Sequence, residues 1–115
     1  MAFLGEKMEK VTIDEVNRKI NNGEEIVFVD SRAAHVWDKA KTKIPGAIRI
    51  PPDKAEKRLS NVRKDAYVVT YCTWPNEASS TRVAQILENH GYKDAHPLIG
   101  GLEVWEKANL PVETK

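Results

Sequence analysis

Two runs stand out along the chain: residues 26–29 are all apolar, and residues 67–71 are apolar except for Thr70. Both are short, and β-branched side chains are frequent in them. Such runs are typical of strands that are buried on both faces, as in a parallel sheet. Residues 47–50 and 95–98 predict two further short strands, although Pro97 weakens the second of them.

The polar segments between these runs show the spacing of amphipathic helices. Thr12 and Glu15 predict a capping box, in which each side chain bonds the backbone of the other residue, so a helix is expected to begin there. Gly100 and Gly101 precede another helix, and Gly101 is expected to need a positive φ or a close backbone approach. Further helices are expected at 33–40, at 53–59 and on the face formed by Val83, Ile86, Leu87 and His90, which Gly91 ends.

Strands and helices alternate along the whole chain. This order predicts an α/β fold with a mainly parallel central sheet and helices on both faces. The chain has 115 residues and no internal repeat or linker, which fits one domain. We place this domain at residues 1–115, with an ordered core at about 8–112.

Composition limits the partners that are expected. Hydrophobic residues make up 41% of the chain and charged residues 30%, as in ordinary globular domains, and the net charge of +1 gives no electrostatic case for nucleic acid or an anionic membrane. No apolar run approaches the ~20 residues of a spanning helix. The first ten residues lack the apolar segment of a signal peptide. We therefore expect a cytoplasmic protein with no nucleic-acid or membrane partner.

Cys72 is the only cysteine of the chain. An internal disulfide is therefore impossible, and a multi-cysteine metal site is excluded. His35, His90 and His96 do not have the spacing of metal ligands, and we expect all three to be surface or packing residues. No metal and no cofactor is predicted.

The position of Cys72 favours a reactive thiol over a buried structural one. It directly follows the predicted strand 67–71, and sites in open α/β sheets form beyond the carboxyl ends of the strands. A polar loop, residues 73–79, then leads into a helix. Backbone N–H groups of such a loop and the positive end of the helix dipole both favour the thiolate. This arrangement fits sulfur transfer, phosphate-ester hydrolysis or a redox-sensing thiol.

Several segments together resemble rhodanese domains, in the order that the family has them. They are Asp30-Ser31-Arg32, Ile44-Pro45-Gly46-Ala47, the strand that ends in Cys72, Gly91-Tyr92, the stretch from Leu98 through Gly100-Gly101 to Trp105, and Leu110-Pro111-Val112. The resemblance covers nearly the whole chain. Each segment is a weak signal alone, and their shared order makes the combination specific.

The resemblance implies a cysteine-dependent sulfurtransferase of the thiosulfate type. Cys72 would take a sulfane sulfur, become a persulfide and pass the sulfur to a thiophilic acceptor. The partners would be a small-molecule or protein-bound sulfur donor and that acceptor, and the active-site loop could also meet a protein partner. The family's motif places substrate binding on the loop residues Thr73, Trp74, Pro75, Asn76, Glu77, Ala78 and Ser79.

Two other functions stay open at this point. Many relatives carry an arginine where this loop has Glu77, and an acidic loop favours a non-enzymatic sulfur carrier or protein-interaction module on the same fold. A phosphatase needs an arginine about six residues after its nucleophile to hold the phosphate, and Ala78 occupies that place. The phosphatase therefore ranks last.

The remaining candidate residues have a structural and a functional interpretation each. We expect Asp30 and Arg32 to form a structural ion pair, the alternative being that Arg32 binds an anion. Trp105 is expected in the core. Trp74 either lines the mouth of a pocket or packs within its loop. The charged stretch 39–43 is expected to be a solvated face, with recruitment of an anionic substrate as the alternative.

Overall fold

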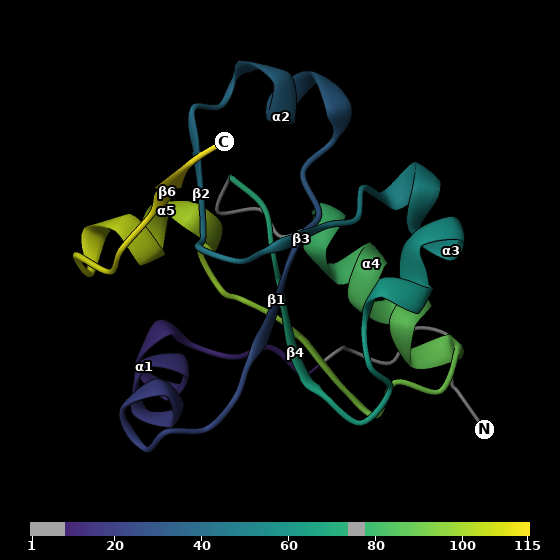
Figure 1. The fold of residues 1–115 in the computed structure, drawn as a ribbon, viewed down its shortest axis with the longest axis horizontal. Helices are drawn as coiled ribbons and strands as arrows, with labels where there is room; N and C mark the ends of the chain where they lie inside the picture. The colour runs from purple at the N-terminus through teal and green to yellow at the C-terminus, as the bar shows by residue number, and fades with distance from the viewer. Residues whose placement is uncertain (1–8, 74–77) are drawn as a thin grey trace.

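The computed structural model describes residues 9–73 and 78–115, and a four-stranded parallel sheet lies at its centre (Figure 1). The strands are β1 (Val27–Asp30), β3 (Ile48–Arg49), β4 (Tyr67–Tyr71) and β5 (Asp94–Pro97). Their order in the sheet is β3-β1-β4-β5, and all neighbours are parallel. The predicted parallel sheet is confirmed, with strand ends that differ from the predicted ones by at most one residue.

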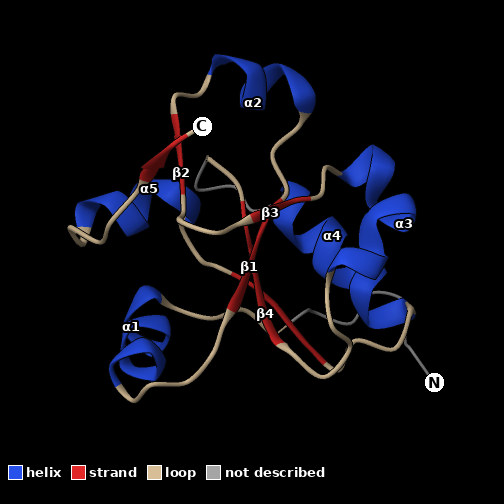
Figure 2. Cartoon of the chain, viewed as in Figure 1, coloured by secondary structure: helices blue, strands red, loops and turns tan. Residues whose placement is uncertain are grey.

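Helices cover both faces of this sheet, as the alternation of elements predicted (Figure 2). Adjacent residues of β4 show how the two cores are built. Val68 packs with Val83 and Leu87 on the face covered by α3 (Ala55–Arg58) and α4 (Ala78–Asn89). Val69 packs with Trp105 on the face covered by α1 (Ile13–Asn21) and α5 (Gly101–Lys107). Both valines are completely buried, which explains why adjacent positions of β4 are apolar.

Local signals at two helices are confirmed. The Thr12 side chain accepts a hydrogen bond from the Glu15 N–H at 3.1 Å, and the Glu15 carboxylate accepts one from the Thr12 N–H at 3.0 Å, which is the predicted capping box. Trp105 on α5 is buried, stands edge-on to Phe28 at a ring separation of 5.2 Å and donates its indole N–H to the Pro111 carbonyl. Trp105 is therefore a core residue.

Two regions differ from the sequence-based expectation. Residues 53–59 do not form one helix: a 3-10 turn (Pro52–Lys54), the short α3 and a second 3-10 turn (Leu59–Asn61) follow one another. After α2 (Ala34–Lys39), the chain forms β2 (Thr42–Lys43), which pairs antiparallel with β6 (Glu113–Thr114). Part of the stretch expected to be a solvated face is thus a paired strand, and Lys43 lies 3.3 Å from the Glu113 carboxylate.

No helix in the described ranges 9–73 and 78–115 has the length and the hydropathy that crossing a bilayer requires.

The glycine pair before α5 has the backbone geometry expected of it. Gly100 has a φ of +88° and Gly101 a φ of +60°, so both lie in the left-handed region. A Cβ at Gly100 would lie 2.9 Å from the Cβ of Val104, a distance shorter than the contacts that Cβ atoms make in proteins. Gly100 therefore needs both the backbone freedom and the small size of glycine.

Gly100→Ala is expected to lower the free energy of unfolding by about 2–3 kcal/mol, because strain at a positive φ and the contact with Val104 add up. Gly46 is a matched control, since its φ is +75° but nothing lies within 4 Å of the position that a Cβ would take. Gly46→Ala should cost only the backbone strain, about 1 kcal/mol. Urea unfolding of both variants measures the difference, and equal losses would show that the Val104 contact costs nothing.

Candidate functional site

Cys72 lies directly beyond the carboxyl end of β4, where the chain leaves the sheet. Its carbonyl accepts a 2.7 Å hydrogen bond from the Leu102 N–H at the start of α5, which fixes the backbone at this point. The residue is 5% exposed. The thiol is therefore held in a defined place at the edge of the sheet where sites of α/β domains form.

The first turn of α4 contacts the thiol. The Thr70 hydroxyl donates to the Ser80 carbonyl at 2.8 Å, which ties this turn to β4. The Cys72 Sγ lies 4.0 Å from the Ser80 Oγ. The sulfur therefore lies against the amino-terminal turn of a 12-residue helix, where the helix dipole favours negative charge and so the thiolate.

A cavity of about 200 Å³ opens beside the thiol. Its lining includes Cys72 together with Thr73, Ala78 and Ser79, three of the seven loop residues predicted to bind substrate. The other four, Trp74, Pro75, Asn76 and Glu77, lie outside the described residues. The Thr73 Oγ1 is buried and has no hydrogen-bond partner within the described part of the chain.

The cavity is also lined by the segment that follows β1, through Arg32, Ala33, His35 and Val36. Arg32 is 1% exposed and Asp30 is fully buried. The Arg32 Nε lies 2.9 Å from one Asp30 carboxylate oxygen, and its Nη2 lies 2.5 Å from the other. The expected structural ion pair is confirmed, and Arg32 also donates to the Thr42 carbonyl at 3.0 Å.

Tyr71 completes this buried polar cluster. Its hydroxyl donates to the Asp30 carboxylate at 2.9 Å and accepts from the Ile44 N–H at 3.2 Å. Burial raises the pKa of Tyr71 far above the ordinary value, and the negative charge of Asp30 raises it further. For Arg32, burial lowers the pKa, but the hydrogen bonds and charge of Asp30 outweigh it, so the net direction is upward. Arg32 therefore stays charged beside Asp30.

His35 lines the site, although its place in the sequence did not indicate this. It is exposed, as expected, but it lines the thiol cavity and also a second cavity of about 460 Å³. Only the fold brings His35 and Cys72 together, because they follow two different strands. Within the described residues, no three His, Cys, Asp or Glu side chains are grouped in a way that could hold a metal ion.

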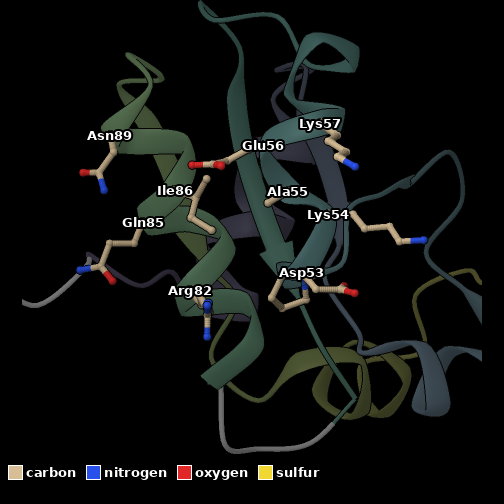
Figure 3. Close-up of a pocket in the computed structure, with 10 residues that line it drawn as sticks. Asp53, Lys54, Ala55, Glu56, Lys57, Arg82, Gln85, Ile86 and Asn89 are labelled. Atoms are coloured by element: carbon tan, nitrogen blue, oxygen red, sulfur yellow. The ribbon is translucent and has the colours of Figure 1, made fainter.

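A third cavity, of about 540 Å³, lies elsewhere, between α4 and the segment 52–57 (Figure 3). Glu56 points toward Ile86 on α4 there, while Lys54 and Lys57 point away from it. Arg82, the first arginine after Cys72, lines this cavity and not the cavity of the thiol. This cavity has no thiol among its described lining residues, so the chemistry of the thiol, and not the size of a cavity, identifies the candidate site.

The fold and this site define an α/β domain with a single cysteine at the end of a central parallel strand. The family model of the rhodanese-like domain matches residues 12–108. The chain therefore belongs to the rhodanese-like domain family, as its motifs implied.

Three known proteins illustrate the similarity. A sulfurtransferase of Allochromatium vinosum is 27% identical over 91% of this chain and 94% of its own length. The thiosulfate sulfurtransferase GlpE of Coxiella burnetii is 32% identical over 76% of this chain and 77% of its own. The crystal structure of the BH2092 protein of Bacillus halodurans superimposes with a TM-score of 0.76 at 32% identity, over 92% of this chain and 77% of that one.

Because of the Tyr71 hydroxyl, the stability of the fold is expected to depend on pH in the alkaline range. The pKa of Tyr71 is higher in the folded state than in the unfolded chain. The contribution of its protonated hydroxyl to the free energy of unfolding is therefore complete below about pH 10, the ordinary tyrosine pKa, and is lost as the pH rises further. Tyr71→Phe is expected to cost about 1–3 kcal/mol at pH 7, since it leaves Asp30 and the Ile44 N–H without this partner. Above pH 10, the variant should lose stability less steeply than the wild type.

Tyr67→Phe is the control, because burial raises the pKa of Tyr67 to about 12 but the ring is only half-buried. Tyr67→Phe should also make the free energy of unfolding fall less steeply above pH 10, but it should lower that free energy less at pH 7 than Tyr71→Phe does. Urea unfolding between pH 7 and pH 11 separates the two effects. Parallel curves for wild type and Tyr71→Phe above pH 10 would contradict the proposed linkage.

Proposed function

We propose that the chain is a sulfurtransferase in which Cys72 carries a sulfane sulfur as a persulfide. One observation carries this proposal: the only thiol of the chain lines a cavity and lies against the first turn of α4. Membership of the rhodanese-like family and the names of two relatives support it. The chemistry needs no cofactor, because sulfur itself is the group transferred.

The reaction has two steps. In the first, the Cys72 thiolate attacks the sulfane sulfur of the donor; a Cys72 S–S bond forms, the donor's own bond to that sulfur breaks, and the leaving group departs with the electron pair, as sulfite does from thiosulfate. In the second, a thiophilic acceptor attacks the outer sulfur, and the electron pair returns to Cys72 as thiolate. Oxidation states balance within the two steps, so no external oxidant or reductant takes part.

The residues from Thr73 to Ser79 are proposed to hold the donor and the persulfide. Backbone N–H groups of a loop that precedes a helix suit an anion bound to the sulfur. The Thr73 hydroxyl, which has no hydrogen-bond partner among residues 9–73 and 78–115, gives a further donor beside the thiol. The Ser80 hydroxyl, at 4.0 Å from the Sγ, can stabilise the thiolate that returns in the second step.

The alternative is a sulfur carrier or protein-interaction module that forms the persulfide without turning it over. The acidic residue Glu77 in the loop favours this alternative, since a carboxylate opposes both a thiolate and an anionic donor. The two functions differ in one observable, the catalytic release of sulfur to an acceptor.

Intact-mass measurement of the reduced protein with several sulfane-sulfur donors tests the central claim. The wild type should gain one sulfur atom and release it to added cyanide or thiol with repeated turnover. Cys72→Ser should lose turnover entirely while its thermal unfolding stays close to that of the wild type, because the change is nearly isosteric. Wild-type turnover in the variant would refute the proposal, and persulfide formation without turnover in the wild type would favour the carrier.

A second prediction concerns Glu77, whose role rests on the sequence alone. If its carboxylate opposes the thiolate, Glu77→Gln should speed alkylation of Cys72 at neutral pH and raise kcat/KM for thiosulfate, and Glu77→Arg should do more. Both effects should shrink at high salt. Alkylation rates and thiosulfate turnover that stay equal in all three proteins would remove Glu77 from the site.

A further inference from the structure

The second cavity borders directly on the cavity of the thiol. The two share Arg32, His35, Val36 and Thr73 in their linings. The remaining lining residues of the second cavity are Lys39, Ala40, Lys41, Thr42, Leu102 and Glu106. Its volume of about 460 Å³ falls in the range of roughly 300–1,000 Å³ that is typical of sites for organic molecules. A small inorganic donor bound at Cys72 would leave this space unused.

The charges around the second cavity favour an anionic occupant. Lys39 and Lys41 are exposed, whereas the charge of Arg32 is balanced by Asp30. Glu106 is the one carboxylate in the described lining, and the Thr42 hydroxyl lies 3.5 Å from it. The lining thus holds two lysines whose charge Asp30 does not balance and one acidic side chain.

The apolar part of the cavity fits the carbon skeleton of such a molecule. Val36, Ala40 and Leu102 contribute to its lining. Leu102 is buried, and its backbone is bonded to the Cys72 carbonyl. The wall around Thr42 is held by the pairing of β2 with β6 and by Arg32. The lining is therefore attached to ordered elements at several points.

We propose that the second cavity binds the body of an organic thiol that carries carboxylates, whose sulfur reaches Cys72 through the shared residues. The inference rests on the proposed function and names the class of acceptor for it. The carboxylates meet Lys39 and Lys41, and the thiolate attacks the outer sulfur of the Cys72 persulfide. The sulfur–sulfur bond to Cys72 breaks, its electron pair returns to Cys72, and the thiol's proton passes to solvent.

Glutathione, which has two carboxylates, is a suitable probe, and 2-mercaptoethanol is the uncharged comparison. In the variant Lys39→Gln with Lys41→Gln, KM for glutathione should rise about five- to tenfold and KM for 2-mercaptoethanol by a much smaller factor. The difference should shrink at high salt. Lys54→Gln with Lys57→Gln removes the same charge at the other cavity and serves as the matched control.

Binding is measured separately from turnover. S-methylglutathione keeps both carboxylates but cannot react, and its affinity for the Cys72→Ser protein, determined by calorimetry, should fall in the Lys39/Lys41 variant and not in the control. If the protein lacks turnover with every acceptor but this binding holds, the proposed function fails and the site stands. If turnover holds but the Lys39/Lys41 variant and its control behave alike with glutathione and with S-methylglutathione, the site fails and the proposed function stands.

Discussion

The buried ion pair between Asp30 and Arg32 is the interaction on which the site depends. Asp30 ends β1 in the middle of the sheet, opposite Arg49 of β3 and Tyr71 of β4. A carboxylate without exposure would be strongly unfavourable alone, but Arg32 and the Tyr71 hydroxyl saturate it. The same guanidinium then holds the carbonyl of Thr42. One charged cluster thereby joins the carboxyl ends of β1 and β4 to the segment around Thr42.

This cluster explains why a strongly charged group lies beside the thiol without acting on it as a free cation. Arg32 lines both cavities, yet its charge is neutralised at close range by Asp30. The positive potential available to an anion therefore comes from elsewhere, from the first turn of α4 near the sulfur and from the lysines farther out. Arg32 thus shapes the walls of the site, whereas the first turn of α4 and the lysines attract an anion.

Local patterns predicted most of the fold. Apolar runs locate buried parallel strands, and the capping box of Thr12 and Glu15 forms as the sequence indicates. The pairing of β2 with β6 was not predictable, because each strand has two residues and their partners lie far apart in the chain. Residues 53–59 were also mistaken for one helix, since apolar spacing does not distinguish an α-helix from a helix interrupted by 3-10 turns.

For the site, the sequence predicted the position of Cys72 and the pairing of Asp30 with Arg32, because both follow strands that are easily recognised. Tyr71 and His35 were missed. Tyr71 is a strand residue whose hydroxyl meets Asp30 only through strand pairing, and His35 reaches the thiol cavity only through the packing of α2 over the sheet edge. The spacing of residues along the sequence does not indicate polar contacts between residues of different strands.

The hydrogen bond from the Leu102 N–H to the Cys72 carbonyl has a consequence for synthesis of the chain. As the protein leaves the ribosome, β4 and the thiol emerge well before α5 and β6, which carry this donor and the partner of β2. The backbone at Cys72 is therefore secured, and the wall around Thr42 closed, only late in translation. Until then the nascent thiol lacks its native enclosure, so the time between these events sets its exposure to oxidants and to premature sulfur donors.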